Sequence, residues 1–125
     1  MSVFAELAGL GVATVYEASG REGLVDVDLT RIVPDSRVAG PARTVRCGAG
    51  DNLMVHASLA HVRPGDVLVL TLPEPQPVAL MGDLLATQAL AHGVAGVLVD
   101  AAVRDVDELR ALSLPVWARW VRVTG

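Results

Sequence analysis

The apolar positions of the chain change their spacing several times after residue 37, and each spacing is typical of a strand or of a helix. Short runs of almost continuous apolar residues are typical of buried strands, whereas apolar residues three and four positions apart are typical of helices. The run at 67–72 is of the first kind, and Met81, Leu84 and Leu85 begin a pattern of the second kind. The whole pattern predicts strands over 37–47, 67–72, 94–99 and 114–120, separated by helices over 51–61, 80–92 and 105–112.

This alternation predicts a single domain over residues 1–125, of the α/β class, with a mostly parallel sheet. Right-handed crossovers between parallel strands are expected to place helices on both faces, which makes a layered α/β/α arrangement. Before residue 37 the pattern predicts two short helices over 2–8 and 12–18, followed by a loop. The prolines at 73–77 predict an extended loop within the domain, because the part of the chain after them is too short to fold alone.

The composition excludes several classes of function. Apolar residues make up 52% of the chain and aromatic residues 3%, so the core is expected to be aliphatic. The basic residues are all arginine, so a Schiff base between a lysine side chain and a substrate is excluded. The formal charge is -4 and no basic cluster is present, which argues against nucleic acid as the main ligand.

Cellular location and assembly are indicated by three further features. Cys47 is the sole cysteine, so an intrachain disulfide is impossible, which is typical of a reducing cytoplasm. Glu6 stands where a signal peptide carries positive charge, and no apolar run is long enough for a membrane span. We therefore expect a cytoplasmic protein that binds no membrane. The mean hydropathy of +0.47 is high for a small domain, so other subunits are expected to cover part of its apolar surface.

Charged residues follow two of the predicted strands, in the segments 81–85 and 100–105. In open α/β sheets, functional groups gather in the loops beyond the carboxyl ends of the strands. One interpretation is purely structural and is favoured by the pattern alone. Asp105 and Glu108 form a capping box at a helix start, Arg104 pairs with Asp100 or Asp107, and Asp83 complements a helix dipole.

The other interpretation is that two carboxylates and a guanidinium converge on one pocket. Oxygen ligands and water suit magnesium or manganese. A turn at Gly82, followed by the free amides of a helix start, would hold a carboxylate, and an arginine would stabilise an oxyanion. These are the parts of an enolate-forming lyase.

The remaining polar residues with chemical potential carry weaker signals. His56 and His61 are five positions apart, so they do not form the paired zinc face of a helix, and a surface or partly buried role is expected. Asp51 and Asn52 are predicted to cap a helix, with a role in a pocket left open. Cys47 is predicted to be a small buried thiol.

The chain resembles the RraA-like family, which includes the 4-hydroxy-4-methyl-2-oxoglutarate aldolases and the regulator of ribonuclease activity A. The resemblance spans most of 12–120, and its most specific element is an acid separated by twenty residues from an Arg-Asp pair. Asp83, Arg104 and Asp105 satisfy this spacing. The matching blocks are AGPARTV (39–45), GDNL (50–53), RPGDVLV (63–69), GDLL (82–85), GVAGV (93–97) and VRD (103–105).

The resemblance implies a fold of the swivelling-domain type and a class II aldolase that depends on Mg²⁺ or Mn²⁺. It implies that Asp105 ligates the metal and that Arg104 contacts the substrate. Gly82, Asp83, Leu84 and Leu85 would bind the pyruvyl carboxylate, and Asp83 would also orient water and move protons. The family forms homotrimers or hexamers with sites between subunits.

The implied reaction is the cleavage of 2-oxo acids of the 4-hydroxy-4-methyl-2-oxoglutarate type to pyruvate, with oxaloacetate decarboxylation as a side activity. The alternative is a non-catalytic regulator that binds a ribonuclease or another protein, but that branch lacks the acid that Asp83 supplies here. Two departures from the family pattern stand out. Ala101 replaces a glycine, and family members continue beyond the position of Gly125, so the chain is expected to be short at its C-terminus.

Overall fold

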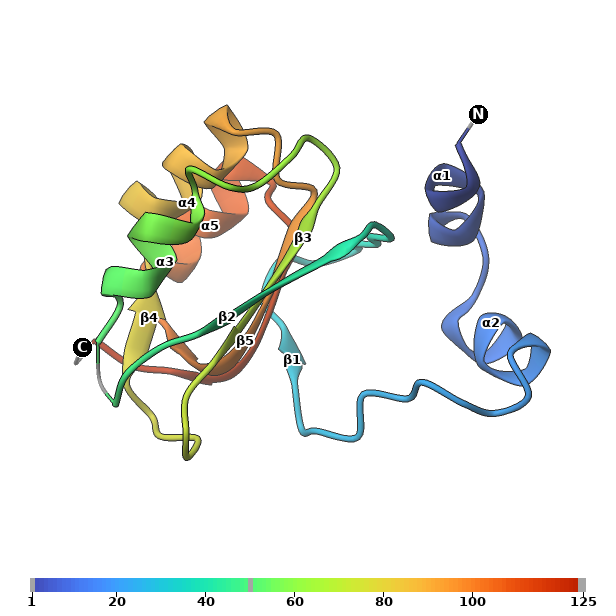
Figure 1. Cartoon of the computed structure of the whole chain (residues 1–125), viewed down its shortest axis with the longest axis horizontal. Helices are drawn as coiled ribbons and strands as arrows, with labels where there is room; N and C mark the ends of the chain where they lie inside the picture. The colour runs from blue at the N-terminus through green and yellow to red at the C-terminus, as the bar shows by residue number, and fades with distance from the viewer. Residues whose placement is uncertain (1, 50, 124–125) are drawn as a thin grey trace.

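A mostly parallel sheet forms the centre of the fold (Figure 1). The computed structural model describes residues 2–49 and 51–123. Within that part of the chain the strand order is β1-β6-β5-β3-β2, with β4 also paired to β5, and every pairing is parallel except that of β1 with β6. The predicted sheet is therefore confirmed. Its strands are β1 (Thr30–Arg31), β2 (Ala42–Arg46), β3 (Val67–Thr71), β4 (Ala79–Met81), β5 (Gly96–Val103) and β6 (Val116–Val121).

Strand β5 is longer than predicted, and two strands share one of its sides. Its first half pairs with β3, from Val67 opposite Gly96 to Leu70 opposite Val99. Its last residues pair with the short strand β4, which places Ala79 opposite Ala102. The prediction of a loop from residue 100 was therefore wrong, as was the prediction of a helix from residue 80. The apolar side chains before residue 83 extend the sheet instead, and the charged loop shrinks to residues 104 and 105.

The helices between the strands all lie on one face of the sheet (Figure 1). This differs from the expected covering of both faces, and the strand order explains the difference. From β2 through β3 and β5 to β6 the chain always moves the same way across the sheet, so right-handed crossovers return on the same side. The helices are α1 (Val3–Ala8), α2 (Val12–Ala18), α3 (Leu53–Ser58), α4 (Asp83–Ala91) and α5 (Val106–Leu112). None of the described helices is long and apolar enough to cross a membrane.

The core lies between that helical layer and the sheet. Leu68 and Leu70 of β3 point into it and are almost fully buried, whereas Val69 between them is only partly buried. The predicted burial of this strand on both faces is therefore wrong for the single chain. Val55 of α3 and Leu109 of α5 close the core from the other side. As the composition predicts, the core is aliphatic.

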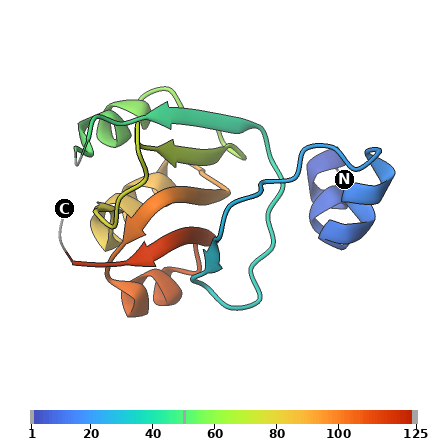
Figure 2. The same ribbon diagram turned by 90° about the horizontal axis from the view of Figure 1, so that it is seen from below.

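The amino-terminal helices α1 and α2 have the predicted positions but stand apart from the sheet (Figures 1 and 2). Neither helix has a buried residue, and Val3 and Val12 are 60% and 81% exposed. The predicted loop that follows contains the short strand β1, which is anchored by the buried side chains of Ile32 and Val33. This arm therefore presents an apolar surface that the rest of the chain does not cover.

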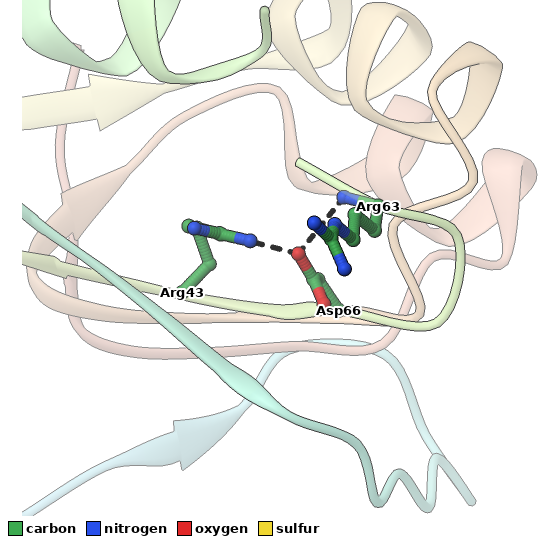
Figure 3. A network of polar contacts seen from close by, with 3 residues as sticks. All are labelled: Arg43, Arg63 and Asp66. Carbon is green, nitrogen blue, oxygen red and sulfur yellow. Dashed lines mark hydrogen bonds and ion pairs between the residues drawn. The ribbon is translucent and has the colours of Figure 1, made fainter. Parts of the chain in front are cut away.

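A buried carboxylate joins β2 and β3 at their amino ends (Figure 3). Asp66 is the only charged side chain that is buried in the described part of the chain. Its Oδ2 accepts hydrogen bonds from the backbone amide of Arg63 at 2.9 Å and from Nε of Arg43 at 3.3 Å. The Arg63 amide first, and then Arg43, hold the pKa of Asp66 below its usual value, although burial opposes them. We interpret this network as structural, because it links β2 to the turn before β3.

Candidate functional site

The turn at Gly82, between β4 and α4, is the point where the predicted site residues meet. The backbone of Gly82 is extended, with φ -141° and ψ -161°, so its conformation does not require glycine. The lack of space around it does require glycine, because a Cβ atom there would overlap Oδ2 of Asp105 and lie 3.1 Å from Cγ of Arg104. The absence of a side chain therefore lets the loop after β5 approach the turn after β4.

Asp105 adopts a left-handed backbone conformation, with φ 58° and ψ 45°, immediately before α5. Its side chain makes no hydrogen bond that caps α5. Instead, its Oδ2 accepts a hydrogen bond of 3.1 Å from the backbone amide of Asp83. The favoured interpretation of Asp105 and Glu108 as a capping box is therefore wrong. The left-handed conformation, which costs a residue with a side chain about 1–2 kcal/mol, turns the carboxylate back across the Gly82 turn.

Arg104 reaches the same place from the end of β5. Its backbone amide donates to the carbonyl oxygen of Met81 at 3.0 Å, which fastens the two loops together. Its Nε lies 3.8 Å from Oδ2 of Asp105, and about half of its side chain is exposed. Its predicted pairing with Asp100 or Asp107 is wrong, since Asp100 pairs with Arg119 of β6. The guanidinium thus has most of its donors free for a ligand.

The first turn of α4 offers further polar groups. The carboxylate of Asp83 is exposed and has no hydrogen-bond or ion-pair partner among the described residues. The amides of Leu84 and Leu85 likewise have no acceptor in that part of the chain, as is usual for the first turn of a helix. Free amides at the start of a nine-residue helix favour an anion such as a carboxylate. The Asp83 amide, also predicted to bind a carboxylate, donates to Asp105 instead.

These residues line one pocket at the carboxyl ends of β4 and β5. It contains all six predicted site residues, Gly82, Asp83, Leu84, Leu85, Arg104 and Asp105. Asn52, the N-cap residue of α3, and His56 within that helix line it as well. The sequence left a pocket role open for Asn52 and missed one for His56. The signal that could have found His56 is its spacing of four from Asn52, which places both on one side of a helix.

Two of the weaker predictions concern the segment before α3. Cys47 is buried, as predicted, and burial together with the nearby charge of Asp51 raises the pKa of its thiol. Asp51 caps α3, since its Oδ1 accepts a hydrogen bond of 2.9 Å from the amide of Leu53. Gly50, the first residue of the matching block at 50–53, lies outside the described residues.

The donor set of the pocket fits a hydrated divalent cation. In the described ranges 2–49 and 51–123, no three His, Cys, Asp or Glu side chains gather as a metal site would require. Zinc sites typically use three or four such ligands, whereas magnesium keeps several waters and uses only one or two carboxylates. The second oxygen of Asp105, Oδ1, has no hydrogen-bond partner in that part of the chain, and the side chain is 35% exposed. One carboxylate with a free oxygen therefore suits Mg²⁺ or Mn²⁺ with a chelating substrate.

The chain is similar to known proteins over most of its length. A family model described as RraA-like, Aldolase/RraA, matches residues 12–125. The chain belongs to the RraA-like family. A curated relative from Halalkalibacterium halodurans, named "Putative 4-hydroxy-4-methyl-2-oxoglutarate aldolase", is 39% identical over 117 residues. The match covers 91% of this chain and 55% of the relative, so this RraA-like chain spans about half of that protein's length.

Solved structures of RraA proteins share the fold. The RNA-processing inhibitor RraA from Thermus thermophilus has a TM-score of 0.82 and 28% identity, covering 92% of this chain and 70% of its own. An unusual member of the RNase ES inhibitor RraA family from Streptomyces coelicolor has a TM-score of 0.81 and 27% identity, covering 98% of this chain and 65% of its own. Members of the family thus carry different names: one solved structure is called an RNA-processing inhibitor, another a member of the RNase ES inhibitor RraA family, and the curated relative is named "Putative 4-hydroxy-4-methyl-2-oxoglutarate aldolase".

Proposed function

We propose that this RraA-like site cleaves 2-oxo acids of the 4-hydroxy-4-methyl-2-oxoglutarate type to pyruvate. The observation that carries the proposal is the meeting of Asp105, Arg104 and the Gly82 turn in one pocket, with a free carboxylate oxygen and free backbone amides. A lyase is also supported by the name of the Halalkalibacterium relative. Because the chain lacks lysine, a class II mechanism with a metal is the route open to it.

Asp105 is the residue that would hold the cation. When bound, Mg²⁺ or Mn²⁺ supplies a Lewis acid for the carboxylate and keto oxygens of the substrate. The Asp83 amide fixes the orientation of Asp105 by donating to Oδ2, which leaves Oδ1 for the ion. The left-handed backbone of Asp105, which gives α5 no side-chain cap, would serve this role by turning the carboxylate toward the Gly82 turn.

The backbone amides of Leu84 and Leu85 would receive the carboxylate of the pyruvyl unit. They point out of the first turn of α4, where the helix dipole also favours an anion. Leu85 is buried and Leu84 is exposed, so Leu85 anchors the turn in the core. This fixed position would align the bond between carbon 3 and carbon 4 for cleavage.

Arg104 and Asp83 would serve the reacting atoms. As the bond between carbon 3 and carbon 4 breaks, its electron pair enters a pyruvate enolate while a base takes the proton of the carbon 4 hydroxyl. Arg104 would stabilise the enolate oxygen, and its half-exposed guanidinium has donors free to do so. Asp83 would deliver a proton through water to carbon 3, which completes pyruvate. Loss of carbon dioxide from oxaloacetate gives the same enolate, so that activity should accompany the cleavage.

A coupled assay of pyruvate release tests the proposal. The purified chain is given 4-hydroxy-4-methyl-2-oxoglutarate or oxaloacetate, with Mg²⁺ or Mn²⁺, and pyruvate is followed by its reduction to lactate. We expect release from both substrates, and its loss on adding a chelator and return on adding excess metal. Release that is unaffected by the chelator, or no release from either substrate, would contradict the proposal.

A second candidate function is supported by the structural neighbours. The Thermus and Streptomyces proteins are described as an RNA-processing inhibitor and a member of a ribonuclease inhibitor family. A non-catalytic regulator would bind a ribonuclease or another protein, and the pocket residues would then be dispensable. Inhibition of a purified ribonuclease that persists when Asp105 is replaced by alanine would favour this candidate over the lyase.

We also propose that the protein assembles into a homotrimer or hexamer in the cytoplasm. The support is the apolar surface of the amino-terminal arm, where Val3 and Val12 are well exposed. Light scattering at micromolar concentration should report a multiple of the 13.0 kDa chain, and a monomer would contradict the assembly. The cytoplasm is proposed because a buried free thiol such as Cys47 suits a reducing compartment.

A further inference from the structure

One face of the sheet keeps an apolar row that the helices do not cover. The helices α3, α4 and α5 lie on the other face (Figure 1). Val69, Leu98 and Trp117 lie side by side on the open face, because Val69 is opposite Leu98 and Leu98 is opposite Trp117. These three residues, the apolar row, alternate with buried core residues and are only partly buried themselves. Parallel sheets are normally covered on both faces, so the apolar row is expected to have a partner.

The chain itself covers this face only at the amino ends of the strands. Gly96 lies on the open face, since it precedes the fully buried Val97. A Cβ atom on Gly96 would come within 3.0 Å of Cγ2 of Val38, so Val38 packs over it. A Cβ atom on Gly40 would likewise lie 3.2 Å from Cγ2 of Val67. The segment before β2 therefore protects the beginning of β3 and β5, and the apolar row beyond it stays partly exposed.

The amino-terminal arm, residues 2–29, has apolar side chains that could cover such a row. It lies beyond the amino ends of the strands (Figure 2). One side-chain hydrogen bond ties it to the body, from Nη1 of Arg37 to the carbonyl oxygen of Gly9 at 3.3 Å. The arm thus projects from its own subunit toward a neighbouring one. Its exposed large apolar side chains are Val3, Phe4, Leu10, Val12, Leu24 and Val25.

The arm and the open face carry opposite charges. Residues 2–29 contain five acidic side chains and one arginine, so the arm has a formal charge of -4, the whole net charge of the chain. Cross-strand pairing places Arg31 and Arg46 on the open face, at the two edges of the sheet. Neither forms an ion pair in the described part of the chain, whereas Asp100 on the same face is paired with Arg119. An acidic apolar arm therefore complements a basic apolar face.

We propose that the amino-terminal arm of one copy packs across the apolar row of a second copy, with its acidic side chains beside Arg31 and Arg46. These two arginines and the Asp100–Arg119 pair form the rim of the contact, which stays accessible to solvent. The contact joins two different surfaces, so its repetition from copy to copy closes a ring such as the proposed homotrimer. The inference rests on the proposed assembly, to which it assigns a contact surface, and is independent of the lyase.

Sedimentation velocity over a concentration series tests the role of the arm. Val12 is 81% exposed in the single chain, so Val12→Asp should leave the fold and its thermal midpoint unchanged. We expect this variant to raise the dissociation constant of the assembly about tenfold or more, because it buries a charge against the apolar row. Val123→Asp is the matched control, since Val123 is 80% exposed and lies outside the arm. It should associate like the wild type.

Charge reversal tests the open face and its pairing with the arm. Arg46→Glu should raise the dissociation constant about tenfold, because it places an acid beside an acidic arm. Glu17→Arg should weaken association from the other side, by removing negative charge from the arm. The variant that carries both substitutions should recover part of the lost association. Both positions are exposed, so thermal unfolding should stay as in the wild type.

Quenching of Trp117 by acrylamide distinguishes the arm of a second copy from the chain's own arm. Trp120→Phe leaves Trp117 as the one tryptophan of the chain. Quenching should increase when dilution dissociates the assembly, since the arm then leaves the apolar row. Shielding of Trp117 that persists in the dissociated chain would place its own arm on the face, which overturns the inference.

The same measurements separate this inference from the proposed assembly. A wild-type multimer that neither Val12→Asp nor Arg46→Glu weakens is held by another surface. That result contradicts the docking of the arm and leaves the assembly standing. A wild type that stays monomeric at micromolar concentration contradicts both. The assay of pyruvate release tests the lyase separately.

Discussion

The two ends of the parallel strands each carry an aspartate beside an arginine, and the two pairs differ in how fully the carboxylate is hydrogen-bonded. At the amino ends, Asp66 is buried, is held by the Arg63 amide and Arg43, and has a lowered pKa. At the carboxyl ends, Asp105 is partly exposed, has one backbone donor and lies 3.8 Å from the guanidinium of Arg104. A satisfied carboxylate stabilises the fold, whereas one with a spare oxygen can serve a ligand.

The two aspartates also differ in backbone strain. Asp66 sits in an ordinary backbone conformation, while Asp105 is one of the few residues with a side chain whose φ is positive. The conformation of Asp105 brings its carboxylate to the Gly82 turn and does nothing for the helix that follows. Strain retained at a partly exposed residue points to function, and the following predictions test that contrast.

The largest expected effect comes from the pair at the carboxyl ends. Asp105→Ala and Arg104→Lys should each lower the rate of pyruvate release by about 10²- to 10³-fold, because the first removes the carboxylate proposed to hold the cation and the second replaces a planar fork by a point charge. Steady-state kinetics with both substrates measure the loss. Asp107→Ala is the matched control, since Asp107 is exposed and lies outside the pocket. Wild-type rates in either pocket variant would sink the assignment.

The next effect concerns the space between the two loops. Gly82→Ala should reduce pyruvate release about 10²-fold, because the new methyl group would push the Asp105 carboxylate and Arg104 out of position. Gly48→Ala is the control, because a Cβ there would make only an ordinary contact of 3.8 Å with Asp51. The measurement is kcat/KM together with the thermal midpoint. If Gly82→Ala and Gly48→Ala were equally active, the close approach of the loops would not matter for the reaction.

At the amino ends the expected loss is in stability. Asp66→Asn should lower the free energy of unfolding by about 2 kcal/mol, because the buried hydrogen bonds from Arg63 and Arg43 lose the charge of their acceptor, while KM for the substrate should not change. Urea denaturation followed by the fluorescence of Trp117 and Trp120 measures the difference. A drop in kcat/KM without a loss of stability would reverse the roles assigned to the two ends.

The pH dependence sharpens the same prediction. The pKa of Asp66 is lower in the folded protein than its ordinary value of 3.8. Its contribution to stability is therefore complete above about pH 4 and is lost as the pH falls below 3.8 toward the lower folded value. The stability difference between wild type and Asp66→Asn should shrink over that range. A difference that stayed constant down to pH 2 would show that the carboxylate charge is irrelevant.

Much of the site could be predicted because two charged segments each follow a strand. Strands β4 and β5 are neighbours, so Gly82 and Arg104 meet at one edge of the sheet. The orientation of Asp105 could not be predicted, because its spacing from Glu108 also satisfies a capping box. Its left-handed conformation depends on a contact with a turn 22 residues earlier, which no local pattern encodes.

The fold shows the same division between local and distant causes. The period of apolar residues located β3 and α4 to within a few residues, since buried runs and helical faces are local properties. The end of β5 was not predicted because Asp100 is charged, and a charged residue directly after an apolar run usually indicates that the strand has ended. Asp100 is accommodated within the strand by Arg119, 19 residues later in β6. The strand order, which puts α3, α4 and α5 on one face, is likewise not encoded in the alternation itself.

The Asp100–Arg119 pair is less buried than Asp66 and less exposed than the Asp105–Arg104 pair. Its removal should have the smallest effect of the substitutions considered. The two side chains are 21% and 27% exposed. Asp100 lies between the buried Val99 and Ala101 of β5, so strand alternation places its side chain on the face opposite the core. Asp100→Asn should lower the free energy of unfolding by about 1 kcal/mol, because solvent screens the pair more than it screens Asp66. Asp28→Asn, at an exposed position before β1, should change it by less than about 0.5 kcal/mol. The comparison uses urea denaturation at pH 7 in low and high salt. A loss of unfolding free energy as large as that of Asp66→Asn would mean that assembly buries this face of the sheet, because a solvent-screened ion pair cannot contribute that much.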